Sequence, residues 1–229
     1  MKKLIILLAL FVISVQSTYA IEIPEQIKSL VPKVDSIVFN KDIRMYEVVA
    51  GRNMFYLSED LKYVFVGNIV RVVDMKNITE EKTSELNRIE WSRLNFENAI
   101  RLSQGKHSIA VFSDPDCPYC RKLHKELKKL KDVSVYVFLS PLKKIHPESE
   151  VKAISIWCSE DRIKALDNAY NDVKIEHKEC ENPINKNLEF MFGNNIYVTP
   201  TIVLESGEIV EGYLPSEKLQ TLIEKEEKK

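Results

Sequence analysis

The chain has 229 residues, enough for one ordinary domain and a smaller second one. Hydrophobic residues make up 45% and charged residues 29%, a balance typical of folded globular proteins and not of disordered chains. The formal net charge of −1 leaves no basic excess to neutralise phosphates, so nucleic acid is not expected as a partner.

The first twenty residues (1–20) have the pattern of a secretory signal peptide. Lys2 and Lys3 precede an uncharged apolar run over residues 4–15, and Thr18 and Ala20 supply small residues for cleavage after Ala20. The alternative is an N-terminal membrane anchor, but this run is shorter than the roughly 20 residues that a spanning helix needs. No cysteine follows the run, which weighs against a lipoprotein anchor.

The cysteines indicate the compartment. All four, at positions 117, 120, 158 and 180, lie in the part expected to be exported. Disulfides form and persist outside the cytoplasm, and an even number leaves no thiol over. Because the signal is short and no retention motif ends the chain, the sequence predicts the bacterial periplasm.

Residues 21–77 are predicted to form a small β-rich domain. After a short helix over 24–30, strands are expected at 43–49, 54–57 and 63–73, with turn-forming residues between them. A segment this short without a disulfide has a marginal core. We therefore expect it to pair with a second copy of the chain or with the next domain.

A polar helix is expected over residues 79–95, with Thr79 as N-cap and Glu80 and Glu81 in the first turn. Its apolar stripe is thin, which is typical of a connector, and residues 78–95 are assigned as a linker helix. The apolar positions of this segment are Leu86, Ile89, Trp91 and Leu94.

From residue 96 onward, strands and helices alternate. A βαβ opening followed by a ββα close is the order of a thioredoxin-like domain, here over residues 96–229 with a helical insertion. The fold class is therefore mixed α+β and α/β. The expected elements are a strand at 107–113, a helix at 118–131, a strand at 133–140, a largely helical region at 147–193, strands at 201–205 and 208–213, and a helix from Pro215.

The stretch FSDPDCPYCRKLHKEL contains Cys117 and Cys120, two positions that several chemistries could use. A c-type haem site needs a histidine directly after the second cysteine, where this chain has Arg121. A zinc site would need two more ligands at close, paired spacing, and Cys158 and Cys180 are too far apart in the sequence to form such a pair. No metal or other cofactor is expected.

A redox pair fits the position better. Cys117 falls between a strand and a helix, where its sulfur faces the unpaired N–H groups and the positive end of the helix dipole. Pro118 suits the first helical position because its missing N–H costs nothing there. Such a position lowers the thiol pKa and supplies the thiolate that attacks disulfides, while Cys120 is placed to resolve the mixed disulfide. The negative charge of Asp116 is expected to oppose ionisation of Cys117.

A third element is Val198-Thr199-Pro200, which opens the strand predicted at 201–205. Proline is tolerated at a strand start, where a ladder donor is not needed. By pattern alone this is a common strand entry, since only about one X–Pro bond in twenty is cis.

The mature sequence resembles, over essentially its whole length, the DsbC/DsbG group of thioredoxin-fold proteins, which includes periplasmic thiol:disulfide isomerases. The motifs that carry the resemblance are Val111-Phe112-Ser113-Asp114 before the cysteine pair, Arg121-Lys122-Leu123-His124 after it, Ile156-Trp157-Cys158, the later Cys180, Thr199-Pro200 and Gly212-Tyr213.

This resemblance implies an N-terminal dimerisation domain, a linker helix and a catalytic thioredoxin-like domain, with two catalytic domains facing a cleft in a V-shaped homodimer. It implies substrates that are misfolded or wrongly disulfide-bonded exported proteins, and a membrane electron donor of the DsbD type. By position it implies the nucleophile Cys117, the resolving thiol Cys120, a cis-proline at Pro200 next to Thr199, and a structural disulfide between Cys158 and Cys180.

Two positions depart from the isomerase pattern. Pro118-Tyr119 separates the cysteines, as in DsbG and glutaredoxins, whereas DsbC-type isomerases typically have Gly-Tyr there. Val111 lies where thioredoxin keeps a buried acid, so the sequence does not identify what deprotonates Cys120. Two further functions therefore remain open, a DsbG-like reductase or chaperone that binds unfolding proteins and a dedicated reductant for cytochrome maturation, although the latter does not need an N-terminal domain.

Overall fold

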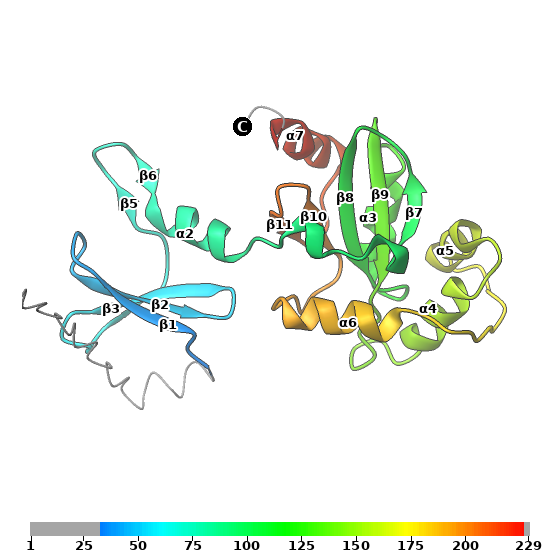
Figure 1. Ribbon diagram of the computed structural model, residues 1–229, viewed down its shortest axis with the longest axis horizontal. Coiled ribbons are helices and arrows are strands. Elements are labelled where there is room, and N and C mark those ends of the chain that lie inside the picture. The colour runs from blue at the N-terminus through cyan, green and yellow to red at the C-terminus, as the bar shows by residue number, and fades with distance from the viewer. Residues whose placement is uncertain (1–32, 227–229) are drawn as a thin grey trace, which may run out of the picture. The chain divides into compact units, whose positions relative to one another are not determined.

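The computed structural model describes residues 33–226 (Figure 1). The predicted signal peptide at 1–20 and the predicted helix at 24–30 lie outside these residues. The chain divides into two compact units, with the break between Val66 and Gly67. The boundaries predicted at 77/78 and 95/96 stay predictions, and each unit is described here by itself.

The first unit contains a four-stranded antiparallel sheet in the order β1-β2-β3-β4. The sequence predicted β2 and β3 but missed β1, which is one of the two edge strands. The buried side chains of this sheet are Val48, Ala50, Phe55 and Leu57. Its strands are β1 (Ser36–Asn40), β2 (Met45–Ala50), β3 (Asn53–Ser58) and β4 (Val64–Phe65).

The prediction of one continuous strand over residues 63–73 is wrong. This run is divided into β4 and β5 (Val70–Arg71), and β5 forms a two-stranded antiparallel ladder with β6 (Lys76–Asn77). Gly67, at φ +146°, interrupts the run in a conformation that few other residues adopt. Gly67 is therefore the residue that divides the predicted strand in two.

The predicted linker helix is shorter than expected. Helix α2 spans Ile78–Leu86 and is capped by Asn77, whose side chain accepts a hydrogen bond from the Glu80 N–H at 3.0 Å. The N-cap is thus Asn77 and not Thr79. The helix ends nine residues before Asn95, the end predicted from the sequence.

The residues after α2 belong to the core of the second unit. They form two short 3₁₀ helices, Trp91–Arg93 and Phe96–Asn98. Ile89 and Leu94 are buried, and the Ile89 N–H donates to the Gly207 carbonyl at 2.9 Å. A Cβ at Gly207 would lie 2.2 Å from the Ile89 oxygen, so only glycine allows this approach. The thin apolar stripe therefore packs on the sheet and does not continue a helix.

The second unit contains a five-stranded mixed sheet in the order β11-β10-β8-β9-β7. Strands β8 and β9 are parallel neighbours, and the other pairs are antiparallel. The strands are β7 (Ile100–Ser103), β8 (His107–Ser113), β9 (Val133–Leu139), β10 (Thr201–Leu204) and β11 (Ile209–Glu211). The predicted βαβ opening and ββα close are confirmed, and β7 is the strand that the sequence missed.

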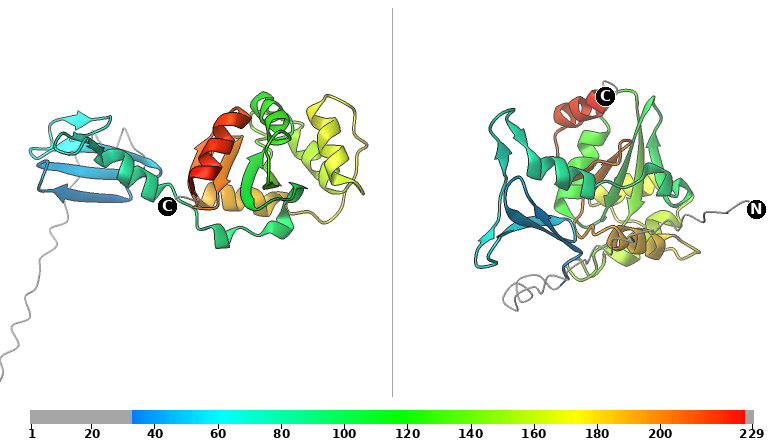
Figure 2. Two further views of the ribbon diagram at one scale, coloured as in Figure 1. Left: turned by 90° about the horizontal axis from the view of Figure 1, so that it is seen from above. Right: turned by 60° about the vertical axis from the view of Figure 1, so that its left-hand side comes forward.

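Helices cover both faces of this sheet, as the view from above shows for α3 (green) and α7 (red) on one side and α6 (gold) on the other (Figure 2). The side of α3 and α7 also packs against α4 and α5, and the side of α6 receives Ile89 and Leu94. The helices are α3 (Pro118–Leu127), α4 (Ser149–Trp157), α5 (Arg162–Tyr170), α6 (Ile184–Gly193) and α7 (Ser216–Glu226).

Across residues 33–226, no helix combines the length and the apolar content that a membrane crossing requires.

Candidate functional site

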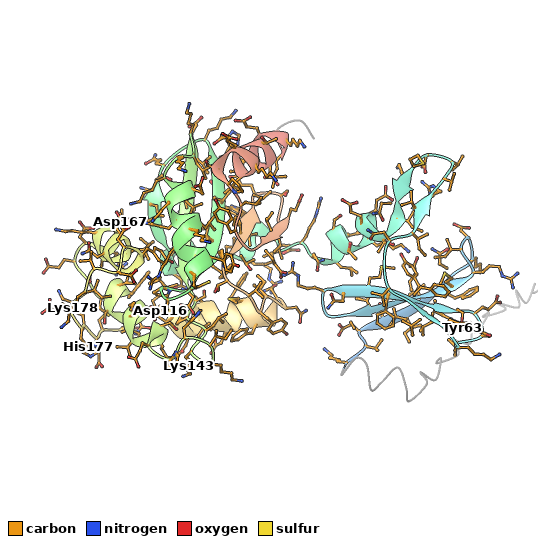
Figure 3. All side chains as sticks on the ribbon, turned by 180° about the vertical axis from the view of Figure 1, so that it is seen from behind. Tyr63, Asp116, Lys143, Asp167, His177 and Lys178 are labelled. Carbon is orange, nitrogen blue, oxygen red and sulfur yellow. A yellow bond between two sulfur atoms is a disulfide. The ribbon has the colours of Figure 1, made fainter. Side chains whose placement is uncertain are left out.

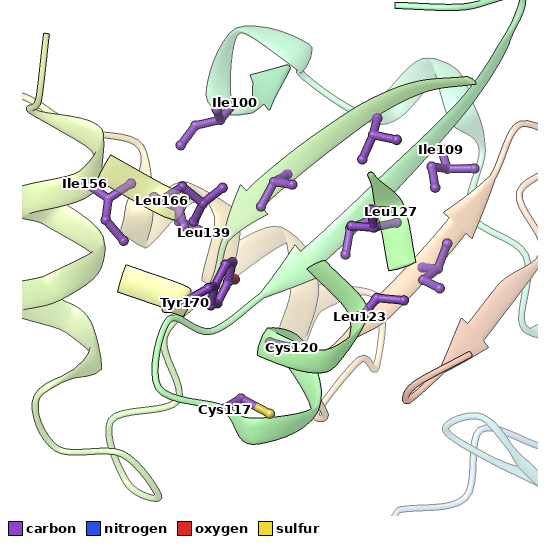
Figure 4. Close-up of a cluster of buried hydrophobic side chains, with 14 of the residues drawn as sticks. Ile100, Ile109, Cys117, Cys120, Leu123, Leu127, Leu139, Ile156, Leu166 and Tyr170 are labelled. Atoms are coloured by element: carbon purple, nitrogen blue, oxygen red, sulfur yellow. The ribbon is translucent and has the colours of Figure 1, made fainter. Parts of the chain in front are cut away.

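Cys117 occupies the N-cap position of α3, at the end of the loop that leaves β8 (Figure 4). Its N–H donates to the Asp114 carbonyl at 3.2 Å, and its own carbonyl accepts the N–H of Arg121 at 3.1 Å, which starts the helical hydrogen-bond ladder. Pro118 follows as the first helical residue. The sulfur thus lies where free backbone N–H groups and the helix dipole favour negative charge.

The Thr199–Pro200 peptide bond, which is cis, lies next to Cys117. The Cys117 sulfur is 3.3 Å from the Thr199 carbonyl oxygen. This contact follows from the sheet, because β10 begins directly after Pro200 and pairs with β8, with Thr201 opposite Phe112. The structure therefore brings together four of the residues that the sequence singled out: Cys117, Cys120, Thr199 and Pro200.

The two sulfurs have opposite acid–base character. The thiol of Cys120 donates a hydrogen bond that, together with the N–H groups of Cys120 and Tyr119 and the Thr199 side chain, lowers the pKa of Cys117 to about 5 despite its burial. Burial, followed by the proximity of Cys117, raises the pKa of Cys120 above its ordinary value. Near neutral pH the pair therefore holds one thiolate, on Cys117, and one thiol, on Cys120.

Asp116 is paired with two cations. Its carboxylate contacts the Lys152 ammonium and lies 3.5 Å from the Arg121 guanidinium. Figure 3 marks the position of Asp116 near the start of α3. These positive charges offset the carboxylate that the sequence predicted to oppose ionisation of Cys117.

Asp114, which the sequence analysis gave no role, holds the loop before Cys117. Its side chain has no exposed surface, and its carboxylate accepts the N–H groups of Leu142 at 2.6 Å and of Asp116 at 2.8 Å. The His146 ring nitrogen Nδ1 lies 3.0 Å from the same carboxylate. The buried carboxylate thus ties the cysteine loop to the segment that follows β9.

The helical insertion contributes further contacts that sequence reasoning missed. His124 on α3 is buried, places Nε2 2.6 Å from the Asp167 carboxylate, and packs on the Tyr170 ring with centroids 4.7 Å apart. Burial lowers the pKa of His124, although Asp167 opposes this shift. The residues of α5 thus shape the environment of α3, a relationship between distant segments that carries no local sequence signal.

The second cysteine pair forms a disulfide, Cys158–Cys180, across a sequence separation of 22. Cys158 caps the C-terminus of α4. It is half-buried and Cys180 is exposed. The bond closes a loop that contains all of α5.

Within the described part of the chain, no three or more His, Cys, Asp or Glu side chains are arranged to hold a metal ion.

Two family models match this chain. Residues 99–227 match the thioredoxin-like domain, and residues 15–80 match the disulfide bond isomerase protein N-terminal domain. The first match alone covers more than half of the chain and contains both cysteine pairs and Thr199-Pro200.

Among curated proteins, the chain is 33% identical over 179 residues to the "Probable thiol:disulfide interchange protein DsbC" of Bordetella avium, covering 77% of this chain and 64% of the relative. It is 28% identical over 189 residues to the thiol:disulfide interchange protein DsbC of Salmonella typhimurium, covering 80% and 78%. The matched region thus spans less than two thirds of the Bordetella protein.

Among solved structures, the chain resembles a disulfide interchange protein from Neisseria gonorrhoeae, with 34% sequence identity and a TM-score of 0.55. The match covers 58% of this chain and 97% of that one. Because a thioredoxin-like domain follows a disulfide-isomerase N-terminal domain, the chain belongs to the thioredoxin-like family and, within it, to the DsbC type of thiol:disulfide interchange protein.

Proposed function

We propose that this chain is a periplasmic thiol:disulfide oxidoreductase that reduces or isomerises wrong disulfides in exported proteins. The observation that carries the proposal is the asymmetry of the Cys117–Cys120 pair. The Cys117 sulfur has a pKa of about 5 at the start of α3, and the Cys120 thiol beside it stays protonated. A nucleophile that is ionised at neutral pH next to a protected second thiol is what disulfide exchange requires.

In the proposed reaction, the Cys117 thiolate attacks one sulfur of a substrate disulfide. A bond forms between Cys117 and that sulfur, the substrate S–S bond breaks, and the second substrate sulfur leaves as a thiolate. If this thiolate attacks another disulfide of the substrate, a different substrate sulfur is released as a thiolate. Attack by that thiolate on the substrate sulfur of the mixed disulfide forms a new substrate disulfide and releases the Cys117 thiolate, so the substrate is isomerised. If Cys120 attacks first, the substrate leaves reduced and the enzyme pair is oxidised.

Thr199 and Pro200 are assigned to substrate binding. The Thr199 carbonyl lies 3.3 Å from the Cys117 sulfur, and Val198 before it is exposed. An extended substrate segment at this position would place its disulfide against Cys117. Cys158 and Cys180 are assigned a structural role, since they are bonded to each other and neither lies at a strand-to-helix junction like the one that activates Cys117.

We place the protein in the periplasm through a signal peptide at 1–20, and we propose a homodimer formed by residues 21–77, joined by a linker at 78–95 to the catalytic domain at 96–229. Side chains in the N-terminal part support a partner surface, because Val66, Val72 and Val73 are each more than 80% exposed. A membrane protein of the DsbD type would return electrons to the oxidised pair, because isomerisation needs Cys117 reduced.

The alternative is a DsbG-like reductase or chaperone, which the Pro118-Tyr119 pair favours. Refolding of scrambled ribonuclease by the purified protein, with and without added reductant, separates these functions. An isomerase restores ribonuclease activity without stoichiometric reductant, and a Cys117→Ala, Cys120→Ala variant does not. Refolding that survives in this double variant assigns the activity to chaperone binding instead.

A further inference from the structure

Two buried hydroxyl groups lie next to the resolving cysteine. Ser113 is the last residue of β8 and Tyr170 the last of α5, and their side-chain oxygens are 2.5 Å apart. Each side chain is 3% exposed. The residue after Ser113 is Asp114, whose N–H donates to the Cys120 sulfur at 3.4 Å. Figure 4 shows Tyr170 beside the first turn of α3, where Cys120 is buried.

The reaction needs Cys120 to ionise, and its surroundings oppose this. The side chain is 1% exposed, and burial raises its pKa, as does the neighbouring Cys117. Val111, which lies on the adjacent strand, has no carboxyl group to accept the proton. The two groups that lower the pKa of Cys120 are the Ser113 hydroxyl and the Asp114 N–H. Both are hydrogen-bond donors, so both favour the ionised sulfur.

We propose that Ser113 and Tyr170 form a hydrogen-bond relay that stabilises the Cys120 thiolate when it attacks the mixed disulfide on Cys117. Between two hydroxyls at this distance one hydrogen is shared. When Tyr170 donates it, the Ser113 hydrogen is free to point at the Cys120 sulfur. In this relay Ser113 donates directly to the reacting sulfur, whereas Tyr170 is a positioning residue that acts through Ser113.

Tyr170 is suited to this role because it remains a donor. Its burial raises the pKa of its hydroxyl well above the ordinary value, so the group stays neutral throughout the working range. The Ser113–Tyr170 contact joins residues 57 positions apart, so Tyr170 is not part of the cysteine motif. The ring is held in turn by His124, which packs against it.

The relay donates hydrogen bonds and keeps its own protons. In the resolving step a bond forms between the Cys120 and Cys117 sulfurs, the bond from Cys117 to the substrate breaks, and the substrate sulfur leaves with the electron pair. The proton lost by Cys120 ends on this departing sulfur or on water. The inference rests on the proposed thiol–disulfide exchange, of which it concerns only the second step.

One equivalent of dithiobis(nitrobenzoate) added to the reduced, full-length protein separates the two steps. Attack by Cys117 releases the first thionitrobenzoate, and attack by Cys120 on the mixed disulfide releases the second. In a Tyr170→Phe variant we expect an unchanged first phase and a second phase slowed about tenfold near neutral pH. We also expect the pH dependence of the second phase to move upward by about one unit, because a tenfold change corresponds to about one unit of pKa.

Ser113→Ala should slow the second phase at least as much, and Ser113→Thr, which keeps a hydroxyl, should restore it. Tyr136→Phe is the matched control, because Tyr136 lies in the cluster on the opposite face of the sheet. This control should leave both phases unchanged.

An unchanged second phase in both Tyr170→Phe and Ser113→Ala would overturn the relay, and so would an equal slowing of both phases, which indicates general distortion of the site. If Tyr170→Phe does not fold, Ser113→Ala against Ser113→Thr decides the question. A lack of any release by the unsubstituted protein would instead overturn the proposed function, and the inference with it.

Discussion

The Cys117 sulfur lies 3.3 Å from the carbonyl oxygen of Thr199, although 82 positions separate the two residues in the chain. The contact depends on the pairing of β10 with β8, since Thr199-Pro200 leads into the first strand and Cys117 follows the second. The pairing of these two strands therefore fixes the distance between Cys117 and Thr199. The reactivity of each cysteine can be tested by experiments that leave this pairing unchanged.

Alkylation should distinguish the two thiols of the reduced protein. Cys117 has a pKa of about 5, so its reaction with iodoacetamide should be nearly independent of pH above about 6 and should fall below this value with a midpoint near 5. Mass spectrometry at pH 6 should find the label on Cys117. Cys120→Ala should move the midpoint upward, because it removes the hydrogen bond that lowers the pKa most. Labelling of Cys120 before Cys117 would contradict the assignment of the nucleophile.

The stability of the reduced protein should depend on pH through Cys117. Its pKa of about 5 in the folded chain lies below the value of about 8.5 expected in an unfolded chain. The unfolded state therefore binds more protons between these values, so the reduced form gains stability as pH rises and loses it as pH falls through about 5. The oxidised form has neither of these thiols and is the control. The melting temperature of the reduced form, relative to the oxidised form, should rise from pH 5 to pH 8; a constant difference would refute this.

The disulfide between Cys158 and Cys180 should stabilise the fold without taking part in turnover. Closing a loop of this length is worth about 3 kcal/mol on the chain-entropy estimate. Replacement of both cysteines by alanine should lower the melting temperature, while the rate of Cys117 alkylation changes little. Peptide mapping that finds either residue bonded to Cys117 or Cys120 in the resting oxidised protein would contradict the separation of the two pairs.

The mature protein should sediment at about twice the monomer mass. Residues 21–77 are too few for a large core of their own, and a second copy would cover the exposed apolar side chains at Val66, Val72 and Val73. A matched variant with lysine at Val72 and Val73 should shift the equilibrium toward monomer. Monomers at micromolar concentration in the unsubstituted protein would rule out this assembly.

The catalytic domain should need residues before 96 to be stable. Ile89 and Leu94 are 2% and 5% exposed, and each buried side chain of this size contributes about 1.5–3 kcal/mol. A fragment starting at Asn87 should therefore unfold at a higher denaturant concentration than one starting at Phe96. Equal midpoints for the two fragments would show that the 89–94 segment adds little to the core.

Much of the second unit could be predicted because its signals are local. The run at 107–113 has an apolar centre at 109–112 and is flanked by loop residues, and the strand occupies this range as predicted. Proline and the cysteine spacing marked the start of α3. Helix α3 ends at Leu127 and not at Lys131, although Leu130 in the last predicted turn still packs against the core.

Other elements depend on contacts that the sequence does not display. Strand β7 is four residues long and pairs with β9 through a register shift, so neither its length nor its pattern identified it. Ile89 and Leu94 fall within the predicted linker helix but pack on the sheet, since Gly207 allows the backbone of Ile89 to approach. The Ser113–Tyr170 contact joins a strand to an insertion helix, and nothing in either segment alone indicates the other.

The segment enclosed by the Cys158–Cys180 bond contains the partners of several residues in and around α3. Asp167 binds His124, Tyr170 binds Ser113, and Asp172 binds Arg121. This segment is therefore closed by one covalent bond and contacts the dithiol region through its side chains. Substitutions in this segment should change the reactivity of the dithiol while leaving the Cys-Pro-Tyr-Cys sequence intact. Protein engineering can therefore adjust the reactive sulfurs without replacing the residues next to them.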